Sequence, residues 1–193
     1  MSSITRFILD RASEPRLQEP APPMSVVDQA LRCAARAPDH ALLRPWRYLV
    51  VEGSGLAALG ELFAACCPPE AADKERDKAR RAPERAPMVI IGIASPNHHP
   101  KVPEAEQVMS AAAGMSFLSL ALSDAGYGTM WRTGPVAYHP AVHEGLGLQP
   151  GESIIGFLYT GTIASEKPPV PRPDTGSYVA RWEAPGQLST WET

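Results

Sequence analysis

The stretch PMVIIGIAS, from Pro87 to Ser95, constrains the fold more than any other part of the chain, because it is apolar almost without interruption. A strand with one face in water alternates apolar and polar residues, whereas a strand covered on both faces is apolar throughout. We therefore expect this stretch to be the central strand of a sheet. With 193 residues, 44% of them hydrophobic, the chain is long enough to enclose such a sheet in one domain.

Apolar spacing predicts further helices and strands on either side of this strand. The stretch ITRFIL has helical spacing and predicts a first helix that ends near Arg11. Ser25 and Ser54 are expected to be the N-caps of the next two helices, the first of which Pro38 would stop. Strands are expected over residues 46–52, 127–133 and 152–161, and further helices over residues 70–86 and 140–148.

The segment from Pro103 to Ala125 carries apolar and small residues on nearly every side. It predicts one long helix, buried in the middle of the molecule or in an interface, where small residues allow close packing. Gly126 and Gly128 form a G-x-G pattern, but the helix precedes it and a strand follows. A dinucleotide fingerprint has the reverse order. Gly126 is therefore interpreted as the left-handed cap that ends the long helix.

After Thr162 the composition changes, with four prolines between Pro168 and Pro173. Such a segment cannot build a core of its own and favours an extended, polyproline-like backbone. The stretch SYVARW within it alternates and could act as an added strand. We therefore divide the chain into a domain over residues 1–163 and an extended arm over residues 164–193, which is expected to wrap around a second copy of the chain.

Several classes of protein are disfavoured by composition. The net charge of −3 is unlike that of nucleic-acid-binding modules. The apolar run from Val108 to Leu122 is too short to span a membrane, and no secretory or transit signal is recognised at the N-terminus. Cys33, Cys66 and Cys67 fit neither a disulfide framework nor a zinc site, and Cys33 is expected to fill the core. We expect a cytoplasmic protein without nucleic-acid or membrane partners.

The candidate sites for acid–base, nucleophilic or metal chemistry are poor. His139 and His143 are spaced as a helical metal pair, but no glutamate lies between them and no third ligand is evident. No metal site and no catalytic acid, base or nucleophile is predicted. Three arginine clusters remain, each beside a hydroxyl, an aromatic ring or a stiffened backbone. Together they are suited to binding a phosphate and a flat aromatic ring. The first cluster contains Arg11 and Arg16, the second Arg36, Arg44 and Arg47, and the third Arg132.

Taken together, these motifs resemble the nitroreductase family of flavoproteins, and most closely its small bacterial NAD(P)H nitroreductases of the YdjA-like type. The matching motifs, which span residues 4–162 in the family's order, are DRASEPRLQEPAP, RAPDHALLRPWRYLVVEG, KARRAPERAPMVI, EAEQVMSAAAGMS, AGYGTMWRTG and IIGFLYTGT. The resemblance implies an α+β fold with a mixed central sheet flanked by helices and a long central helix. It also implies a homodimer with two FMN sites between subunits, and a C-terminal arm that extends onto the partner subunit.

The resemblance also assigns binding residues. Arg11, Ala12 and Ser13 match an R-x-S element for the ribityl and phosphate part of FMN. Arg36 and His40 match flavin contacts, and Trp131, Arg132 and Thr133 match an element that meets the flavin from the other subunit. The nicotinamide nucleotide would be contacted by Ala121, Leu122, Ser123, Asp124, Ala125 and Gly126.

The sequence departs from the family pattern at three of its positions. Pro15 stands where many members have lysine, Leu42 where asparagine is common, and Arg44 where glutamine is common. The stiff corner made by Pro38 and Pro45 is expected to lay the intervening loop along the flavin, with Trp46 anchoring it to the sheet.

The activity implied by the resemblance is that of an FMN-dependent oxidoreductase. A hydride would pass from NADH or NADPH through flavin N5 to a small electron-poor acceptor, a nitroaromatic or a quinone, by a ping-pong mechanism. The alternative is a flavin-binding or storage protein, or a structural homodimer, without efficient turnover.

Overall fold

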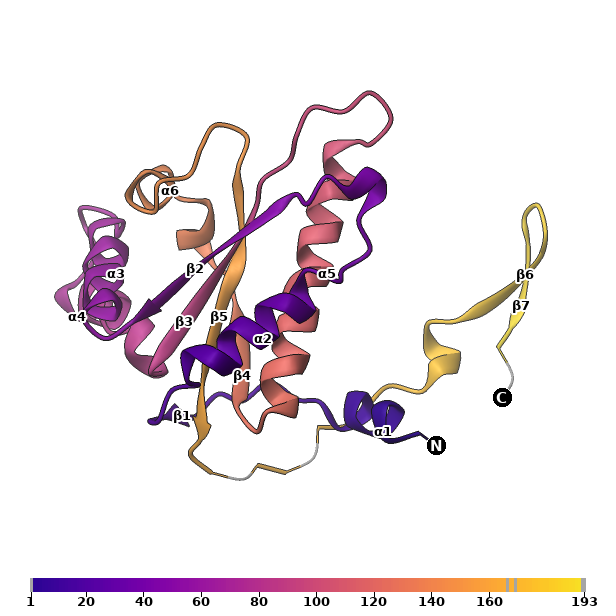
Figure 1. Cartoon of the computed structure of the whole chain (residues 1–193), viewed down its shortest axis with the longest axis horizontal. Coiled ribbons are helices and arrows are strands. Elements are labelled where there is room, and N and C mark those ends of the chain that lie inside the picture. Colours follow the sequence, from indigo (N-terminus) through magenta and orange to yellow (C-terminus); the bar gives the residue numbers. More distant parts are fainter. Residues whose placement is uncertain (1, 166, 169, 192–193) are drawn as a thin grey trace.

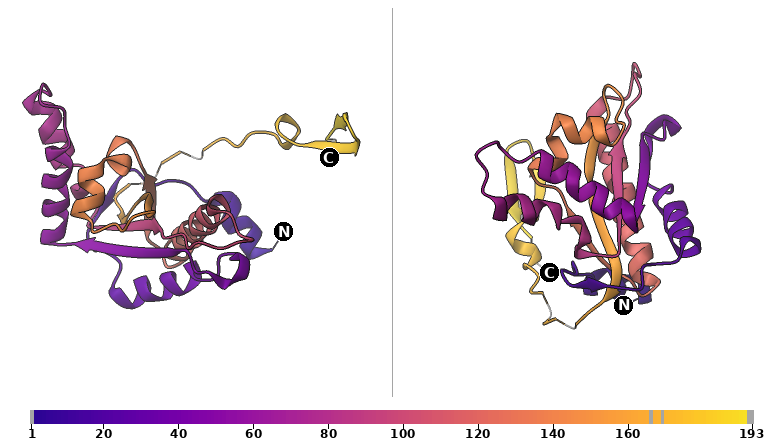
Figure 2. Two further views of the ribbon diagram at one scale, coloured as in Figure 1. Left: turned by 90° about the horizontal axis from the view of Figure 1, so that it is seen from above. Right: turned by 90° about the vertical axis from the view of Figure 1, so that its left-hand side faces the viewer.

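The computed structural model describes residues 2–165, 167–168 and 170–191 of the chain. A five-stranded sheet lies between two layers of helices, and a C-terminal arm extends away from this body (Figures 1 and 2). Strand β3 (Met88–Ala94) pairs with both β2 (Trp46–Glu52) and β5 (Ser153–Ile163). All seven residues of β3 are buried. The predicted central strand is therefore confirmed.

The two remaining strands of the body both pair with β5. They are β1 (Leu17–Gln18) and β4 (Gly128–Arg132). The predicted α+β class is confirmed, but every strand pair in the described part of the chain is antiparallel, so the expected mixture of parallel and antiparallel pairs is not found. Strands β3 and β4 both run antiparallel to β5 and therefore in the same direction as each other, because α5 carries the chain back along the sheet between them.

Alternate residues of β3 enter two separate cores. Val89 and Ile91 pack with the residues of α3 (Ser54–Ala65) and α6 (Pro140–Gly145) on one face. Met88 and Ile90 pack against α2 (Met24–Ala34) and α5 (Glu104–Asp124) on the other. Because strand side chains alternate between faces, an apolar residue is needed at each position of a strand covered twice.

The remaining helices are short. Helix α1 (Ser3–Asp10) begins the described chain, and α4 (Asp73–Arg80) packs on α3. Single turns of 3₁₀ helix occur at His40–Leu42, Pro83–Arg85, Pro135–Tyr138 and Thr175–Ser177.

The long helix α5 spans 21 residues, as the sequence predicted within one residue at each end. A side chain at Gly114 would lie 2.7 Å from the Tyr48 hydroxyl, which shows how closely α5 approaches β2 and α2. Gly126 has φ of +89°, and the Tyr127 amide donates to the carbonyl of Leu122 at 3.0 Å. The predicted left-handed cap is therefore confirmed, because this backbone conformation favours glycine.

Three local predictions are wrong. Helix α2 begins at Met24 with Pro23 as its N-cap, and α3 has Gly53 as its N-cap, so neither Ser25 nor Ser54 caps a helix. Cys33 is exposed rather than buried. The buried face of α2 consists of Val27, Ala30 and Ala34, at helical spacing, and Cys33 lies outside that narrow stripe.

Gly60 allows α3 and α4 to pack at backbone distance, and its replacement tests this contact. A β-carbon at Gly60 would lie 2.0 Å from the carbonyl oxygen of Arg80. Gly60→Ala is expected to lower the free energy of unfolding by about 2 kcal/mol, because a backbone atom cannot rotate away. Thermal unfolding measures the effect. Gly55→Ala in the same helix is the control: it meets only a Val51 methyl group at 3.2 Å, and an equal loss there would contradict the prediction.

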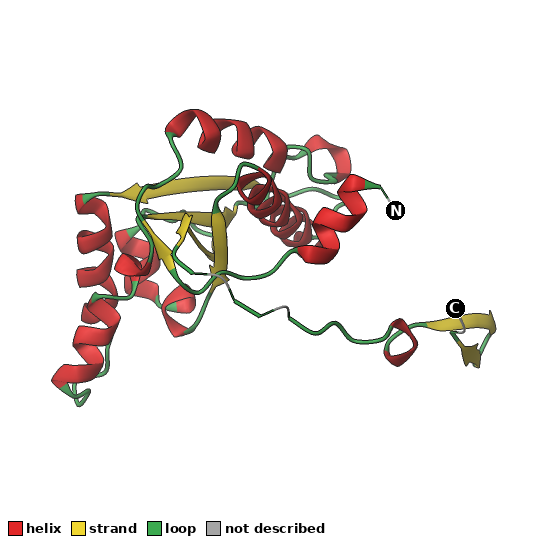
Figure 3. Cartoon of the chain, turned by 90° about the horizontal axis from the view of Figure 1, so that it is seen from below, coloured by secondary structure: helices red, strands yellow, loops and turns green. Residues whose placement is uncertain are grey.

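The arm leaves the end of β5 and reaches a two-stranded hairpin, β6 (Ala180–Ala184) and β7 (Gln187–Thr190). Figures 1 and 3 show the hairpin well separated from the body of the chain. The predicted strand in SYVARW is confirmed in its second half, but it pairs with β7 of its own chain. Trp182 and Leu188 are both exposed.

Candidate functional site

The turn after α1 lies against the start of the C-terminal arm. The Lys167 ammonium donates to the backbone carbonyl of Ser13 and forms an ion pair with Glu14 at 2.9 Å. The Arg172 guanidinium donates to the carbonyl of Arg11. Between these segments is a cavity of about 460 Å³, lined in part by Ala12.

Lys167 and Arg172 were not among the residues that the sequence singled out. They are the two basic residues of KPPVPRP. This sequence could have identified them, because it places two cationic side chains on a stiff, extended backbone. Lys167 also lines a smaller cavity of about 190 Å³ together with Pro15. The arm therefore places the ammonium group of Lys167 near Pro15, the position at which many family members have lysine.

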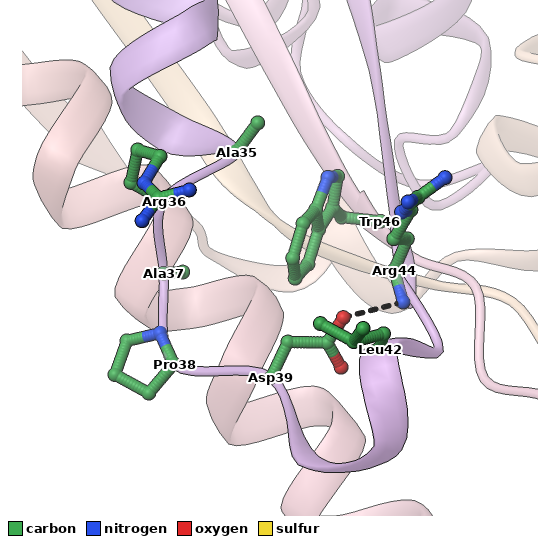
Figure 4. Close-up of a pocket in the computed structure, with 8 residues that line it drawn as sticks. All are labelled: Ala35, Arg36, Ala37, Pro38, Asp39, Leu42, Arg44 and Trp46. Carbon is green, nitrogen blue, oxygen red and sulfur yellow. Dashed lines mark hydrogen bonds between the residues drawn. The ribbon is translucent and has the colours of Figure 1, made fainter.

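The loop between α2 and β2 forms a second cavity, of about 420 Å³ (Figure 4). The Asp39 carboxylate accepts hydrogen bonds from the backbone amides of Leu43 at 3.2 Å and Arg44 at 2.7 Å. Ala41, Leu42 and Arg44 have φ values of 63°, 55° and 50°. Three non-glycine residues in this region store strain, which in proteins is concentrated at functional sites.

His40 belongs to a third cavity, of about 490 Å³, on the other side of this loop. Its Nδ1 lies 3.2 Å from Oε2 of Glu106, in the first turn of α5. The Ser110 hydroxyl donates to the carbonyl of Pro38, which ties the loop to the same helix. The expected rigid corner is therefore present in the structure.

One chain does not bring the predicted flavin contacts together. His40 contacts the first turn of α5, whereas the amide of Glu14 donates to the carbonyl of Thr129, shortly after α5 has ended. A helix of 21 residues is about 30 Å long. The turn containing Arg11 to Ser13 and the loop containing Arg36 and His40 thus lie near opposite ends of α5 (Figure 1).

The side chains of Trp131 and Arg132 are engaged within the protein. The Trp131 indole donates to the carbonyl of Ile155 at 3.3 Å and lies so close to Gly156 that a β-carbon there would be 2.1 Å from Nε1. The Arg132 guanidinium stacks over Tyr159 at 5.7 Å. Trp131 and Arg132 are half-buried and Thr133 is exposed, and the flavin contact of these three residues stays a prediction.

The segment expected to contact the nicotinamide nucleotide is the C-terminal end of α5 and its cap. Leu122 is fully buried, and Ala121 and Ser123 are half-buried. Asp124, Ala125 and Gly126 are exposed. The end of a helix presents carbonyl oxygens and partial negative charge, which suits amide or hydroxyl donors better than phosphate.

Among the residues that the structure describes, no group of three or more His, Cys, Asp or Glu side chains is placed to hold a metal ion. In the same part of the chain, no helix combines the length and the apolar character that crossing a bilayer requires.

Comparison with known proteins decides the family. The sequence profile of the Nitroreductase family matches residues 8–162. The chain belongs to the nitroreductase family. It is 39% identical over 159 residues to the Escherichia coli (strain K12) protein named "Putative NAD(P)H nitroreductase YdjA", a match that covers 81% of this chain and 86% of that protein.

Solved structures of nitroreductase-like proteins share the fold. A nitroreductase-like family protein from Bacillus cereus superposes with a TM-score of 0.80 at 24% identity, covering 95% of this chain and 98% of that one. A variant of the FMN- and NADPH-dependent nitroreductase NfnB from sphigopyxis sp. strain HMH superposes with a TM-score of 0.74 at 18% identity, covering 94% and 99%. The nitroreductase predicted from sequence is thus confirmed as an enzyme of flavin-dependent oxidoreduction.

Proposed function

We propose that this nitroreductase passes a hydride from NADH or NADPH, through FMN, to a small electron-poor acceptor such as a nitroaromatic or a quinone, by a ping-pong mechanism. The observation that carries the proposal is the convergence of Lys167 and Arg172 on the turn from Arg11 to Ser13. Two segments 150 residues apart meet around one cavity in a manner suited to a phosphate dianion.

The cations Lys167 and Arg172 line the cavity together with the carboxylates of Asp10 and Glu14, and we propose that the phosphate of FMN binds the N–H donors that these contacts leave free. An ammonium group has three N–H donors, and Lys167 uses two of them on Ser13 and Glu14. A guanidinium group has five, and Arg172 uses two on the carbonyls of Arg11 and Val170. Donors therefore remain on both side chains, and the exposed Arg11 and Ser13 add a guanidinium and a hydroxyl.

A second copy of the chain would complete each flavin site. The loop with Arg36 and His40 lies too far along α5 to reach the phosphate turn of its own chain, so we propose that it contacts the flavin bound mainly by the partner. Helix α1 supports a dimer: Ile4, Ile8 and Leu9 are exposed, and the helix buries no residue. A helix of eight residues is marginal alone in water, so a partner surface would stabilise it.

The arm completes the proposed dimer. We divide the chain into an FMN-binding domain over residues 1–163 and an arm over residues 164–193 that crosses to the partner. An isolated two-stranded hairpin is at best marginally stable, so the exposed Trp182 and Leu188 of β6 and β7 favour docking on another surface.

The chemistry places few demands on the protein's own acids and bases. When bound, FMN supplies the hydride-accepting N5. The residues of the chain then have to hold the phosphate, exclude water and present one face of the ring to the two substrates in turn. The proposed contacts are Trp131, Arg132 and Thr133 for the flavin ring and Ala121 to Gly126 for the nicotinamide nucleotide. The proposed location is the cytoplasm.

Anaerobic reduction tests the function. The purified chain is expected to be yellow, or to become yellow with added FMN, and to bleach on addition of NADH or NADPH. A nitroaromatic or quinone should then restore the colour, and absorbance near the flavin band measures both steps. A protein that binds FMN without bleaching would be a flavin carrier, and one that does not bind FMN would be a structural dimer; either result refutes the proposal.

A further inference from the structure

The cavity formed by the loop between α2 and β2 combines an aromatic surface with two cations. The Trp46 ring faces the interior, Arg36 and Arg44 lie on opposite sides of it, and Leu42, which is 75% exposed, lies at the edge beside Asp39 (Figure 4). The volume of about 420 Å³ is in the range of small-molecule pockets. Arg36 is already assigned to the flavin, whereas no role follows from the proposed function for Arg44.

The side chains of this cavity carry more positive than negative charge, which favours the binding of an anion. Neither Arg36 nor Arg44 forms an ion pair among the described residues. The acidic side chain of the cavity, Asp39, already accepts two backbone amide hydrogen bonds. Its charge is therefore partly compensated by the loop, and the guanidinium group of Arg44, which has no assignment to the flavin, remains available.

Arg44 has an energetically unfavourable backbone conformation. Its φ of 50° lies in the left-handed region, and its amide and carbonyl are both engaged, with Asp39 at 2.7 Å and with the amide of Trp46 at 2.8 Å. A non-glycine residue in this conformation costs of the order of 1 kcal/mol. The backbone thus fixes where the Arg44 and Trp46 side chains begin, and both side chains line the cavity.

We propose that this cavity binds the electron acceptor, and that the acceptor is a planar aromatic compound with an anionic substituent such as a carboxylate. The ring packs on the Trp46 indole and Leu42, and the carboxylate binds Arg44, because guanidinium groups pair with carboxylates in two parallel hydrogen bonds. The inference rests on the proposed function and adds the class of its acceptor.

Selectivity between a charged and an uncharged acceptor tests the inference. The ratio of kcat/KM for 4-nitrobenzoate to kcat/KM for nitrobenzene is expected to fall about tenfold in Arg44→Gln, since loss of one charge-assisted contact corresponds to roughly that factor. Arg32→Gln is the matched control, because Arg32 lies on α2 and pairs with Asp28 at 2.8 Å on the exposed surface. Equal ratios in the wild type and both variants would overturn the proposal.

Binding without turnover separates this inference from the proposed function. Isothermal titration calorimetry of 4-nitrobenzoate with the purified, unreduced protein is expected to show a Kd about tenfold higher in Arg44→Gln. If the protein bleaches with NADPH but Arg44→Gln binds 4-nitrobenzoate as well as wild type does, the acceptor class is wrong and the function stands. The same two proteins are compared in KM for NADPH and NADH: an effect of Arg44→Gln on NADPH alone would assign the cavity to the nucleotide phosphate and refute the acceptor.

Discussion

Replacing Lys167 and Arg172 together with alanine is expected to give a colourless protein that binds FMN at least 100-fold more weakly than wild type. Both cations reach the turn from Arg11 to Ser13, where the proposed phosphate site lies. A hydrogen bond to a charged group contributes about 1.5 to 3 kcal/mol, so the loss of two exceeds a factor of about 100. Titration of the apoprotein with FMN, followed by quenching of flavin fluorescence, measures the Kd.

The control for this prediction must change the net charge by the same amount as the double variant, at positions far from the proposed phosphate site. Lys101→Ala with Lys74→Ala removes two positive charges from exposed positions in a loop and in α4. FMN affinity close to that of the wild type in the control, with loss in the double variant, supports a local phosphate site. Equal weakening in both would show that only the overall electrostatic field was altered. Unchanged affinity in the Lys167 and Arg172 variant would remove the arm from the site.

Glu152→Gln is expected to destabilise the fold by about 3 kcal/mol, because it leaves the charge of Arg47 unpaired. The pair is bidentate, with Nε to Oε1 at 2.7 Å and Nη2 to Oε2 at 2.5 Å, and it joins β2 to the residues before β5. The Glu152 side chain is 6% exposed and that of Arg47 is 33% exposed. The Glu152 carboxylate also accepts from the amide of Gln149 at 2.8 Å. Urea unfolding monitored by circular dichroism measures the loss.

The same pair predicts a dependence of stability on pH. The hydrogen bond from Arg47 lowers the pKa of Glu152 to about 2, from an ordinary value of 4.5. A carboxylate with a depressed folded-state pKa contributes its full stability above the unfolded pKa and loses it as the pH falls through the folded one. The difference between wild type and Glu152→Gln should therefore shrink between about pH 4.5 and pH 2.

An exposed ion pair provides the comparison. Glu61→Gln removes one of two carboxylate partners of Arg80, whose side chain is 42% exposed and also pairs with Asp77. Such pairs contribute at most about 1 kcal/mol, so this variant should unfold close to the wild type. If Glu152→Gln were no more destabilising than Glu61→Gln, the buried pair would not be a significant contributor to the stability of the fold.

Several features of the protein could be predicted from local sequence alone. Strand β3 was recognisable because each of its positions is apolar, and α5 because small and apolar residues recur around the whole helix. Gly126 was recognisable as a cap, since few other residues tolerate its φ of +89°. The ordered motifs also predicted the family, which the match over residues 8–162 confirms.

Tertiary structure decided where distant segments meet. The sequence could not show that the Trp131 side chain lies against Gly156 or that the Arg132 guanidinium lies over the ring of Tyr159, because both contacts depend on the pairing of β4 with β5. It gave no reason to connect Lys167 or Arg172 with Arg11, because the contact spans about 150 residues and neither partner carries a periodic signal. Periodicity reports which face of an element is buried, whereas the meeting of two polar segments depends on how all the elements pack together.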